Sequence, residues 1–199
     1  MVDQLYTTNI YTKQGRDFAW ADGKGLTIYN LGSGHSRYPN VKGIDLLADR
    51  GADIVHNLDS APWPIADSSV DLLVSFQTFE HLSDLVVAMQ EVHRVLKPGG
   101  QLVVEVPYFR HPGAFQDPTH KHFFTAVTME YFCRTAKRGP VYTTFAFTQK
   151  GFWYGWPRSN SFLARMAKQL ITRHHHAYDR FWSIFFPVPM VVYELEKQG

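Results

Sequence analysis

The chain has 199 residues, of which 45% are hydrophobic, 15% aromatic and 19% charged, and it contains one cysteine, Cys133. This length allows one α/β domain, the composition excludes disordered, collagen-like and coiled-coil chains, and a single cysteine excludes both a disulfide framework and a zinc site built on paired thiolates. The formal net charge of +2 combines an acidic portion, 1–130, with a basic portion, 131–178, which holds eight Lys or Arg residues and no Asp or Glu.

The N-terminal residues 1–20 are polar and interrupted by charged side chains. They lack the pattern of a signal peptide. No run in the sequence reaches the roughly 18 apolar residues that a bilayer span requires. We therefore expect a cytoplasmic protein.

Short apolar runs then alternate with helical patterns, which is typical of βαβ units around a mostly parallel sheet. Apolar residues at helical spacing predict a helix that begins after the N-cap Ser83 and ends at Pro98–Gly100. A second helix is predicted to begin near Thr125, and the aromatic-rich segment 160–186 is predicted to form one long or two shorter helices. The strands are predicted at 27–31, 41–45, 52–56, 70–76, 101–107, 141–148 and 190–195.

A turn with two glycines, Gly32-Ser33-Gly34, follows the first predicted strand. Glycine suits a backbone that must bend sharply and approach a ligand. Asp45 ends the next strand, where a carboxylate can accept both hydroxyls of a ribose. A turn and an acid at the carboxyl edge of an open α/β sheet are the layout of a nucleotide-cofactor site. The alternatives are an ordinary tight turn and an aspartate that caps a turn or helix.

Two common nucleotide motifs are excluded. The dinucleotide fingerprint needs a third glycine where this chain has Arg37, and an acid about 20 residues after the first glycine, whereas Asp45 follows Gly32 by only 13 positions. The phosphate-binding loop of nucleotide triphosphatases needs a Gly-Lys-Ser/Thr sequence, and the turn is not followed by one.

Seven short motifs occur in order along the chain. They are Asn30–Gly34, Gly43–Leu46, Val55–Asp59, Pro62–Trp63, Asp67–Asp71, Phe79–Leu82 and Glu91–Gly100. With these motifs the chain resembles a class I S-adenosylmethionine-dependent methyltransferase, of the small stand-alone kind called type 11. The resemblance covers residues 26–107 and extends more loosely over 108–125.

The resemblance implies a fold, a cofactor and an activity. The implied fold is α/β, Rossmann-like and doubly wound, with a mostly parallel seven-stranded sheet, an antiparallel last strand and a helical, aromatic-rich insert before that strand. We expect one domain over 1–199, with a cofactor-binding half at 26–107 and acceptor-facing loops and a lid at 108–188. The implied cofactor is S-adenosyl-L-methionine, and the implied activity is methyl transfer.

The resemblance also implies roles for single residues. The turn at 32–34 would approach the methionine part of the cofactor, Asp45 would bind the ribose, and Asn57 would contact the adenine amino group. Leu46 and Leu58 would flank the adenine, and the end of the fourth strand would lie beside the transferred methyl. The cofactor-binding residues implied in this way are Asn30, Gly32, Ser33, Gly34, Asp45, Leu46, Asn57, Leu58, Phe76 and Gln77.

Two positions depart from the family pattern. Asn30 replaces the usual acid that opens the glycine motif, and Asn57 replaces the usual aspartate of the adenine contact. An asparagine oxygen still accepts a hydrogen bond, so we expect weaker cofactor binding rather than none.

Methyl transfer from a sulfonium is a direct displacement, so alignment of the reactants supplies much of the acceleration. A base is needed only for a hydroxyl or a protonated amine. His81 follows the fourth predicted strand, and a histidine takes a proton near neutral pH. Its alternative role is to cap or pack at the start of a helix.

The segment after the fifth strand concentrates His111, Asp117, His120 and His122 within a dozen residues. Three interpretations stay open: Asp117 orients His120 as a base; the four side chains hold a divalent metal that positions a diol or carboxylate; or the residues after Asp117 form a turn that only organises the loop. The candidate catalytic residues are therefore His81, His111, Asp117 and His120, and no metal ligand is assigned.

The region 150–186 interleaves aromatic residues with arginine and lysine. In the family, inserts before the last strand form a lid over the acceptor. Rings bury acceptor surface, guanidinium groups pair with phosphate or carboxylate, and basic residues beside aromatic ones also suit peripheral contact with a membrane. The alternative is core packing with a solvated basic face. Nucleic acid is not an expected partner because no nucleic-acid module is visible.

These observations favour a methyltransferase that acts on oxygen or nitrogen of a small-molecule, saccharide or lipid-linked acceptor, with an anionic acceptor favoured by the basic region. The alternatives are a methyltransferase for a macromolecule, protein or nucleic acid, and a regulatory module that binds S-adenosylmethionine without turnover. The sequence carries no signal for an oligomeric state.

Overall fold

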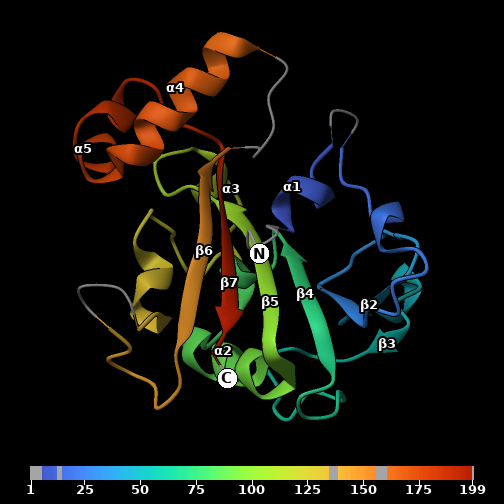
Figure 1. The fold of residues 1–199 in the computed structure, drawn as a ribbon. Helices are drawn as coiled ribbons and strands as arrows, with labels where there is room; N and C mark the ends of the chain where they lie inside the picture. The colour runs from blue at the N-terminus through green and yellow to red at the C-terminus, as the bar shows by residue number, and fades with distance from the viewer. Residues whose placement is uncertain (1–5, 13–14, 135–138, 156–160, 199) are drawn as a thin grey trace.

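One sheet of seven strands organises the protein (Figure 1). The computed structural model describes residues 6–12, 15–134, 139–155 and 161–198. The strands are β1 (Ile28–Leu31), β2 (Val41–Asp45), β3 (Ile54–Val55), β4 (Val70–Phe76), β5 (Leu96–Pro107), β6 (Phe147–Tyr154) and β7 (Met190–Lys197), in the order β3-β2-β1-β4-β5-β7-β6.

The direction of the strands follows the prediction. β7 pairs antiparallel with β5 and with β6, and the other neighbouring strands pair in parallel. The mostly parallel sheet with an antiparallel last strand is therefore confirmed. Residues 72–75 of β4 and 100–107 of β5 are buried without interruption, as expected of strands covered on both faces.

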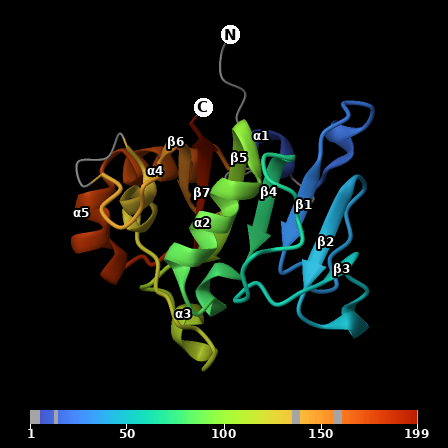
Figure 2. The same cartoon turned by 90° about the horizontal axis from the view of Figure 1, so that it is seen from below.

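The helices cover both faces of this sheet. They are α1 (Thr7–Ile10), α2 (Leu85–Val95), α3 (Gly113–Gln116), α4 (Phe162–Arg173) and α5 (His175–Arg180). Figure 2 shows α2 and α1 on opposite sides of the strands. Met89 and Val92 of α2 join one buried cluster, and Ile10 of α1 joins the other together with Tyr11 and Phe18.

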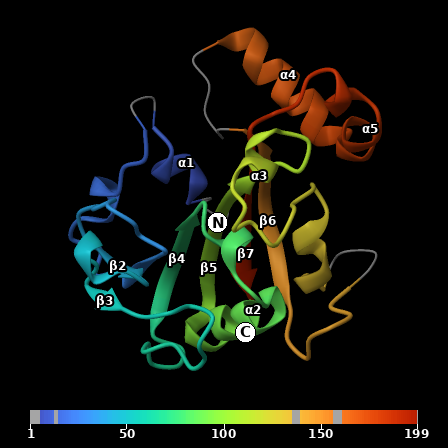
Figure 3. The ribbon, with the colours of Figure 1, turned by 180° about the vertical axis from the view of Figure 1, so that it is seen from behind.

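The helical insert before the last strand is also confirmed. α4, α5 and a short 3-10 helix at Trp182–Ile184 lie between β6 and β7 in the chain. Figure 3 shows α4 and α5 together at the end of the sheet where α3 lies. Residues 156–160, which belong to the predicted lid, lie outside the described residues.

The predicted N-cap of α2 is wrong by one residue. Asp84 is the N-cap, and its Oδ1 accepts hydrogen bonds from the amides of Val86 (2.8 Å) and Val87 (3.0 Å). Ser83 instead donates its hydroxyl to Asp59 Oδ2 at 2.7 Å. Aspartate and serine cap helices about equally well, so the neighbouring contact with Asp59 decides between them.

Other boundaries also differ from the prediction. α2 ends at Val95, before Pro98, and β5 begins directly after it at Leu96, five residues before the expected start at 101. The strand expected at 141–148 begins only at Phe147, because its register with β7 runs from Phe147 opposite Lys197 to Tyr154 opposite Val191. The helix expected near Thr125 is a 3-10 helix at Thr128–Phe132. In the last two cases a pairing or packing partner distant in the sequence sets the boundary.

Glu91 and Arg94 of α2 form an ion pair that also bonds to the backbone of Trp63, in the loop before β4. Glu91 accepts hydrogen bonds from the Trp63 amide and from Arg94, both at 2.6 Å. The hydrogen bonds from Arg94 hold the pKa of the Glu91 carboxyl below its ordinary value of 4.5. A carboxyl whose pKa is lower in the folded state than in the unfolded state stabilises the fold at pH values above its unfolded-state pKa. This stabilisation is lost as the pH falls through the folded-state pKa.

We therefore expect Glu91→Gln to lower the free energy of unfolding by about 1.5–3 kcal/mol at pH 7, the worth of hydrogen bonds to a charged group. Near pH 3 the loss is expected to shrink, because part of the wild-type carboxyl is then protonated as well. Urea denaturation at the two pH values measures the difference. An equal loss at both would contradict a charge-dependent role.

Candidate functional site

The turn after β1 requires glycine. Gly32 and Gly34 have φ angles of +66° and +53°, in the left-handed region. A Cβ added to Gly32 would lie 2.2 Å from Oγ1 of Thr78, which follows β4. At Gly32 the turn therefore lies too close to the loop after β4 to accommodate a side chain.

Asp45 lies directly beside this turn. Asp45 is the last residue of β2, and it is 7% exposed. Its Oδ2 accepts a hydrogen bond from the Gly34 amide at 2.7 Å, and its Oδ1 accepts one from the Leu47 amide at 3.0 Å. Each carboxylate oxygen has a second lone-pair site, so the fixed carboxylate can still accept hydrogen bonds from a ligand.

A cavity of about 260 Å³ opens at the carboxyl ends of β1, β2 and β4. Open α/β sheets bind their ligands at this edge. Six residues predicted from the resemblance line the cavity, and six further residues join them. The predicted residues are Gly32, Asp45, Leu46, Asn57, Leu58 and Gln77, and the further ones are Arg50, His56, Asp59, Thr78, His81 and Leu82.

Four of the predicted cofactor residues lie outside this lining. Asn30 and Ser33 are buried, and Gly34 makes the backbone contact with Asp45. Phe76 packs against the Arg16 guanidinium, whose central carbon lies 4.0 Å from the ring centroid.

Gln77 has an unusual backbone for a residue with a side chain. Its φ angle is +57°, and its amide donates to the Glu105 carbonyl at 2.8 Å. Its Nε2 donates to Glu105 Oε1 at 3.3 Å. Strained backbone of this kind persists where the surroundings enforce it and clusters at binding sites. Here it turns the chain from β4 into the cavity.

The cavity residues that the prediction missed follow a simple rule. Arg50, His56 and Thr78 come shortly after β2, β3 and β4. Their position shortly after a parallel strand is the sequence signal that could have identified them as cavity residues.

A second group of polar side chains adjoins the cavity. The group consists of Glu80, His81 and His120. Each offers one possible metal-ligand atom, and the three atoms lie within 4.8 Å of one another. His120 Nε2 lies 4.0 Å from Glu80 Oε1, and the two histidine rings meet edge to face at 4.7 Å. Glu80 was not among the predicted residues.

Hydrogen bonds fix the orientation of both rings. His120 Nδ1 donates to the Ala114 carbonyl at 2.9 Å. The Thr119 hydroxyl donates to Asp117 Oδ1 at 2.7 Å, so it accepts from His81 Nδ1 at 2.8 Å. Because each Nδ1 carries the proton, each neutral ring has its lone pair on Nε2.

Of the three interpretations of this loop, the structure matches the turn, because Asp117 Oδ1 accepts hydrogen bonds from the Thr119 amide at 2.8 Å and from the Thr119 hydroxyl at 2.7 Å. Asp117 reaches His81 through Thr119 instead of bonding His120 directly. His111 accepts from the Gly113 amide at 3.1 Å and is not part of the group of three. His122 Nε2 is buried with no hydrogen-bond partner among the described residues, and it also lies outside that group.

Burial shifts the protonation of this group. Burial raises the pKa of Glu80 to about 8, and the charges of Glu105 and Asp117 add to the rise. Burial also lowers the pKa of His81, and His120 adds to that effect. Near neutral pH the histidine at the cavity wall is thus held neutral, as a base or a ligand must be.

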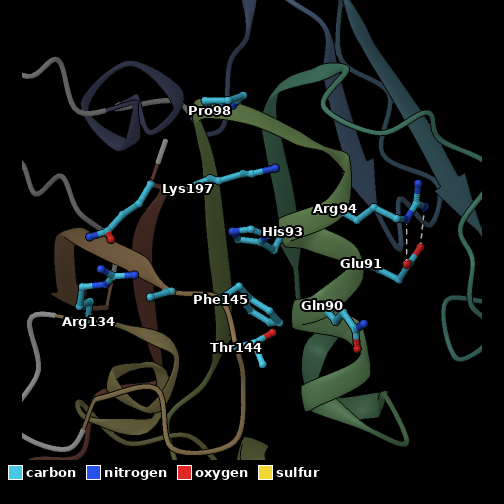
Figure 4. Close-up of a pocket in the computed structure, with 11 residues that line it drawn as sticks. Gln90, Glu91, His93, Arg94, Pro98, Arg134, Thr144, Phe145 and Lys197 are labelled. Atoms are coloured by element: carbon cyan, nitrogen blue, oxygen red, sulfur yellow. Dashed lines mark hydrogen bonds and ion pairs between the residues drawn. The ribbon is translucent and has the colours of Figure 1, made fainter.

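A larger cavity of about 700 Å³ lies elsewhere, between α2 and the segment before β6 (Figure 4). Several of its polar groups already have partners in the protein. Arg94 pairs with Glu91, Lys197 donates to the Leu96 carbonyl at 2.7 Å, and His93 stacks on Phe145 at 4.7 Å. The cavity is near the amino end of β5, whereas the glycine turn lies at the carboxyl edge, so we assign it no role in the chemistry.

The sheet and the cavity at its carboxyl edge define a Rossmann-like cofactor-binding protein. Residues 35–104 match the family model described as a methyltransferase domain. Over these residues the chain is similar to class I S-adenosylmethionine-dependent methyltransferases, which confirms the resemblance and agrees with its implied cofactor. The family match begins directly after the glycine turn, ends within β5 and covers about a third of the chain.

Known proteins agree with this identification. A protein of Mycolicibacterium smegmatis described as a probable S-adenosylmethionine-dependent methyltransferase is 40% identical over 72 residues, which cover 36% of this chain and 23% of that protein. The chain thus spans less than a quarter of that relative. A crystal structure of an S-adenosylmethionine-dependent methyltransferase from Archaeoglobus fulgidus has a TM-score of 0.57 with 14% identity, covering 87% of each chain.

A methyltransferase solved in complex with the Trm112 methyltransferase activator of Haloferax volcanii has a TM-score of 0.56. Its identity is 17%, and the match covers 88% of this chain and 84% of that one. At this identity both structural likenesses show the fold alone.

Proposed function

We propose that the chain is a methyltransferase that binds S-adenosylmethionine in the cavity beside Gly32 and Asp45. The observation that carries this proposal is the Asp45 carboxylate fixed 2.7 Å from the Gly34 amide at the cavity. The carboxylate would accept the ribose hydroxyls, the glycine turn would receive the methionine end, and Asn57 with Leu46 and Leu58 would surround the adenine.

The acceptor would enter past Gln77 and His81. The bound cofactor would supply the methyl carbon for attack by the acceptor oxygen or nitrogen, and neutral S-adenosylhomocysteine would leave with the electron pair of the carbon–sulfur bond. The proton of a hydroxyl or ammonium acceptor would pass to Nε2 of His81 or His120, the lone pairs left open by their Nδ1 contacts. We place Asp117 as the residue that holds His81 in this tautomer through Thr119.

Isothermal titration with S-adenosylmethionine and S-adenosylhomocysteine tests the proposal. We expect one binding site for each ligand, and transfer of labelled methyl groups from the cofactor to an acceptor in cell extract. Absence of binding by both ligands would overturn the proposal. Binding without any transfer would favour a regulatory module, and label in protein or nucleic acid would favour a macromolecular acceptor.

The acceptor class is suggested by an exposed surface on α4 and on the residues after α5. We call it the α4 surface. α4 is a helix of twelve residues with none buried, and its apolar side chains Phe162, Met166 and Leu170 recur every four residues on one face. The large apolar side chains that are more than half exposed here are Phe162, Leu163, Met166, Leu170, Phe181, Trp182, Ile184, Phe185 and Phe186.

The charge of this surface complements an anionic partner. Arg165, Arg173 and Arg180 are exposed among the apolar side chains. The one acid between 161 and 189, Asp179, accepts hydrogen bonds from Tyr108 (2.8 Å) and Tyr154 (2.5 Å) on the inner side. Apolar and basic side chains on one helix suit the interface of an anionic membrane. We therefore propose a lipid-linked acceptor at such a surface.

Among the described residues, no helix combines the length and hydropathy needed to cross a bilayer.

Vesicle flotation tests the α4 surface. We expect the protein to bind vesicles with one third phosphatidylglycerol at least about tenfold more than pure phosphatidylcholine vesicles, and we expect salt to weaken the binding. The double variant Trp182→Ser/Phe185→Ser is expected to abolish most of it. Val141→Ser/Tyr142→Ser removes equally exposed apolar groups elsewhere and serves as the control. Equal binding to both vesicle types, or equal loss in the control, would contradict membrane contact.

A further inference from the structure

We propose that Glu80, His81 and His120 bind one divalent transition-metal ion beside the cofactor cavity. Two imidazoles and one carboxylate are a common ligand set for Zn²⁺, Fe²⁺ and Mn²⁺ in proteins. The proposal rests on the proposed function only for what the ion does to the acceptor. Metal binding itself stands on the geometry of these three side chains.

The spacing of the ligand atoms fits such an ion. The three atoms lie within 4.8 Å of one another, and Glu80 Oε1 lies 4.0 Å from His120 Nε2. Two ligands held at about 2.1 Å from one ion lie roughly 3–3.5 Å apart. Side-chain movements of about 1 Å therefore close the set without a change in the backbone.

Glu80 supplies an independent observation. It is 1% exposed, and neither of its carboxyl oxygens has a hydrogen-bond partner among the described residues. A buried carboxyl with no partner is costly, whereas buried charges are normally paired or coordinate a metal. A metal ion between Glu80 and the histidines removes this cost.

The surroundings orient the histidines as metal ligands. The Ala114 carbonyl holds Nδ1 of His120, and the Thr119 hydroxyl, backed by Asp117, holds Nδ1 of His81. Metal-bound histidines usually donate the other ring nitrogen to a carbonyl or carboxylate in this way. Both Nε2 atoms thereby keep the lone pair that a metal ion needs.

The position of the site suggests what the ion does. His81 lines the cofactor cavity, so the ion would lie beside the space where the acceptor is proposed to enter. The ion would take an oxygen of an acceptor with neighbouring hydroxyls or a carboxylate. A hydroxyl bound to it loses its proton to solvent more readily, and its oxygen then displaces S-adenosylhomocysteine from the methyl carbon. With the ion bound, the histidines act as ligands in place of bases.

Titration of the EDTA-treated protein with Zn²⁺ and with Mn²⁺ tests the site directly. We expect one tight equivalent of at least one of the two ions. Glu80→Gln and His120→Gln are expected to weaken its binding at least about tenfold, and His111→Gln is expected to leave it unchanged. The adjacent histidines 174–176 are a separate source of metal binding, so the measurements use the His174→Gln/His176→Gln background.

Three outcomes would overturn the metal site: no binding of either ion, binding that Glu80→Gln leaves unchanged, or binding lost in the His174→Gln/His176→Gln protein itself. Circular dichroism checks that each variant folds, and the absorption spectrum of the Co²⁺-loaded protein reports nitrogen and oxygen ligands even where a variant is unstable. Titration with S-adenosylmethionine in EDTA separates the two proposals, because cofactor binding without metal binding overturns only the metal site.

Discussion

Asp45→Ala is expected to weaken S-adenosylmethionine binding by about 10- to 150-fold, or 1.5–3 kcal/mol, the worth of hydrogen bonds to a charged group. The variant removes the proposed acceptor of the ribose hydroxyls. It also removes the contacts that hold the Gly34 and Leu47 amides, so the glycine turn loses a support. Isothermal titration measures the affinity.

Asp53→Ala is the matched control for this variant. Asp53 precedes β3 and also accepts a backbone hydrogen bond, from the Gly43 amide in the middle of β2 at 2.6 Å, but it does not line the cavity. We expect it to lower thermal stability while cofactor affinity changes less than about twofold. An unchanged affinity in Asp45→Ala, or an equal loss in both variants, would show that Asp45 serves only the fold.

His120→Ala is expected to lower methyl transfer by at least tenfold and up to about 100-fold, the usual range for loss of a group that handles a proton or supports a metal. Cofactor affinity is expected to stay unchanged, because His120 does not line the cofactor cavity. Transfer of labelled methyl groups to the acceptor and titration with the cofactor measure the two quantities separately.

His93→Ala provides the comparison. His93 stacks on Phe145 in the larger cavity, and the variant is expected to leave the transfer rate unchanged. If His120→Ala lowered transfer and cofactor affinity equally, the cause would be collapse of the loop, since His120 also holds the Ala114 carbonyl. An unaffected transfer rate would remove His120 from the chemistry.

The sequence was sufficient for β2 and β4, which begin and end at the predicted residues, because local signals coincide there. The glycine turn and Asp45 are each specified within a few residues, and the parallel pairing of β1 with β2 brings them together. β6 was misplaced because the alternation of 141–148 continues into 147–154, and only pairing with β7 selects the register.

Glu80 could not be recognised from the sequence. The residues next to Glu80 in the sequence have the polar character of an ordinary loop. Glu80 is buried by a segment that follows some forty residues later in the chain. The Glu80 carbonyl accepts from the amides of Lys121 and His122, at 2.7 and 3.2 Å, which closes the loop over the side chain. The choice between Thr119 and His120 as the partner of Asp117 likewise depends on side-chain rotamers that no sequence pattern specifies.

A crystal structure with S-adenosylhomocysteine bound would show directly whether the cavity beside Gly32 and Asp45 binds the cofactor. We expect both ribose hydroxyls within hydrogen-bond distance of the Asp45 carboxylate, with the amino acid end at residues 32–34 and the sulfur facing His81. A ligand seated in any other cavity, or one whose ribose does not contact Asp45, would contradict it.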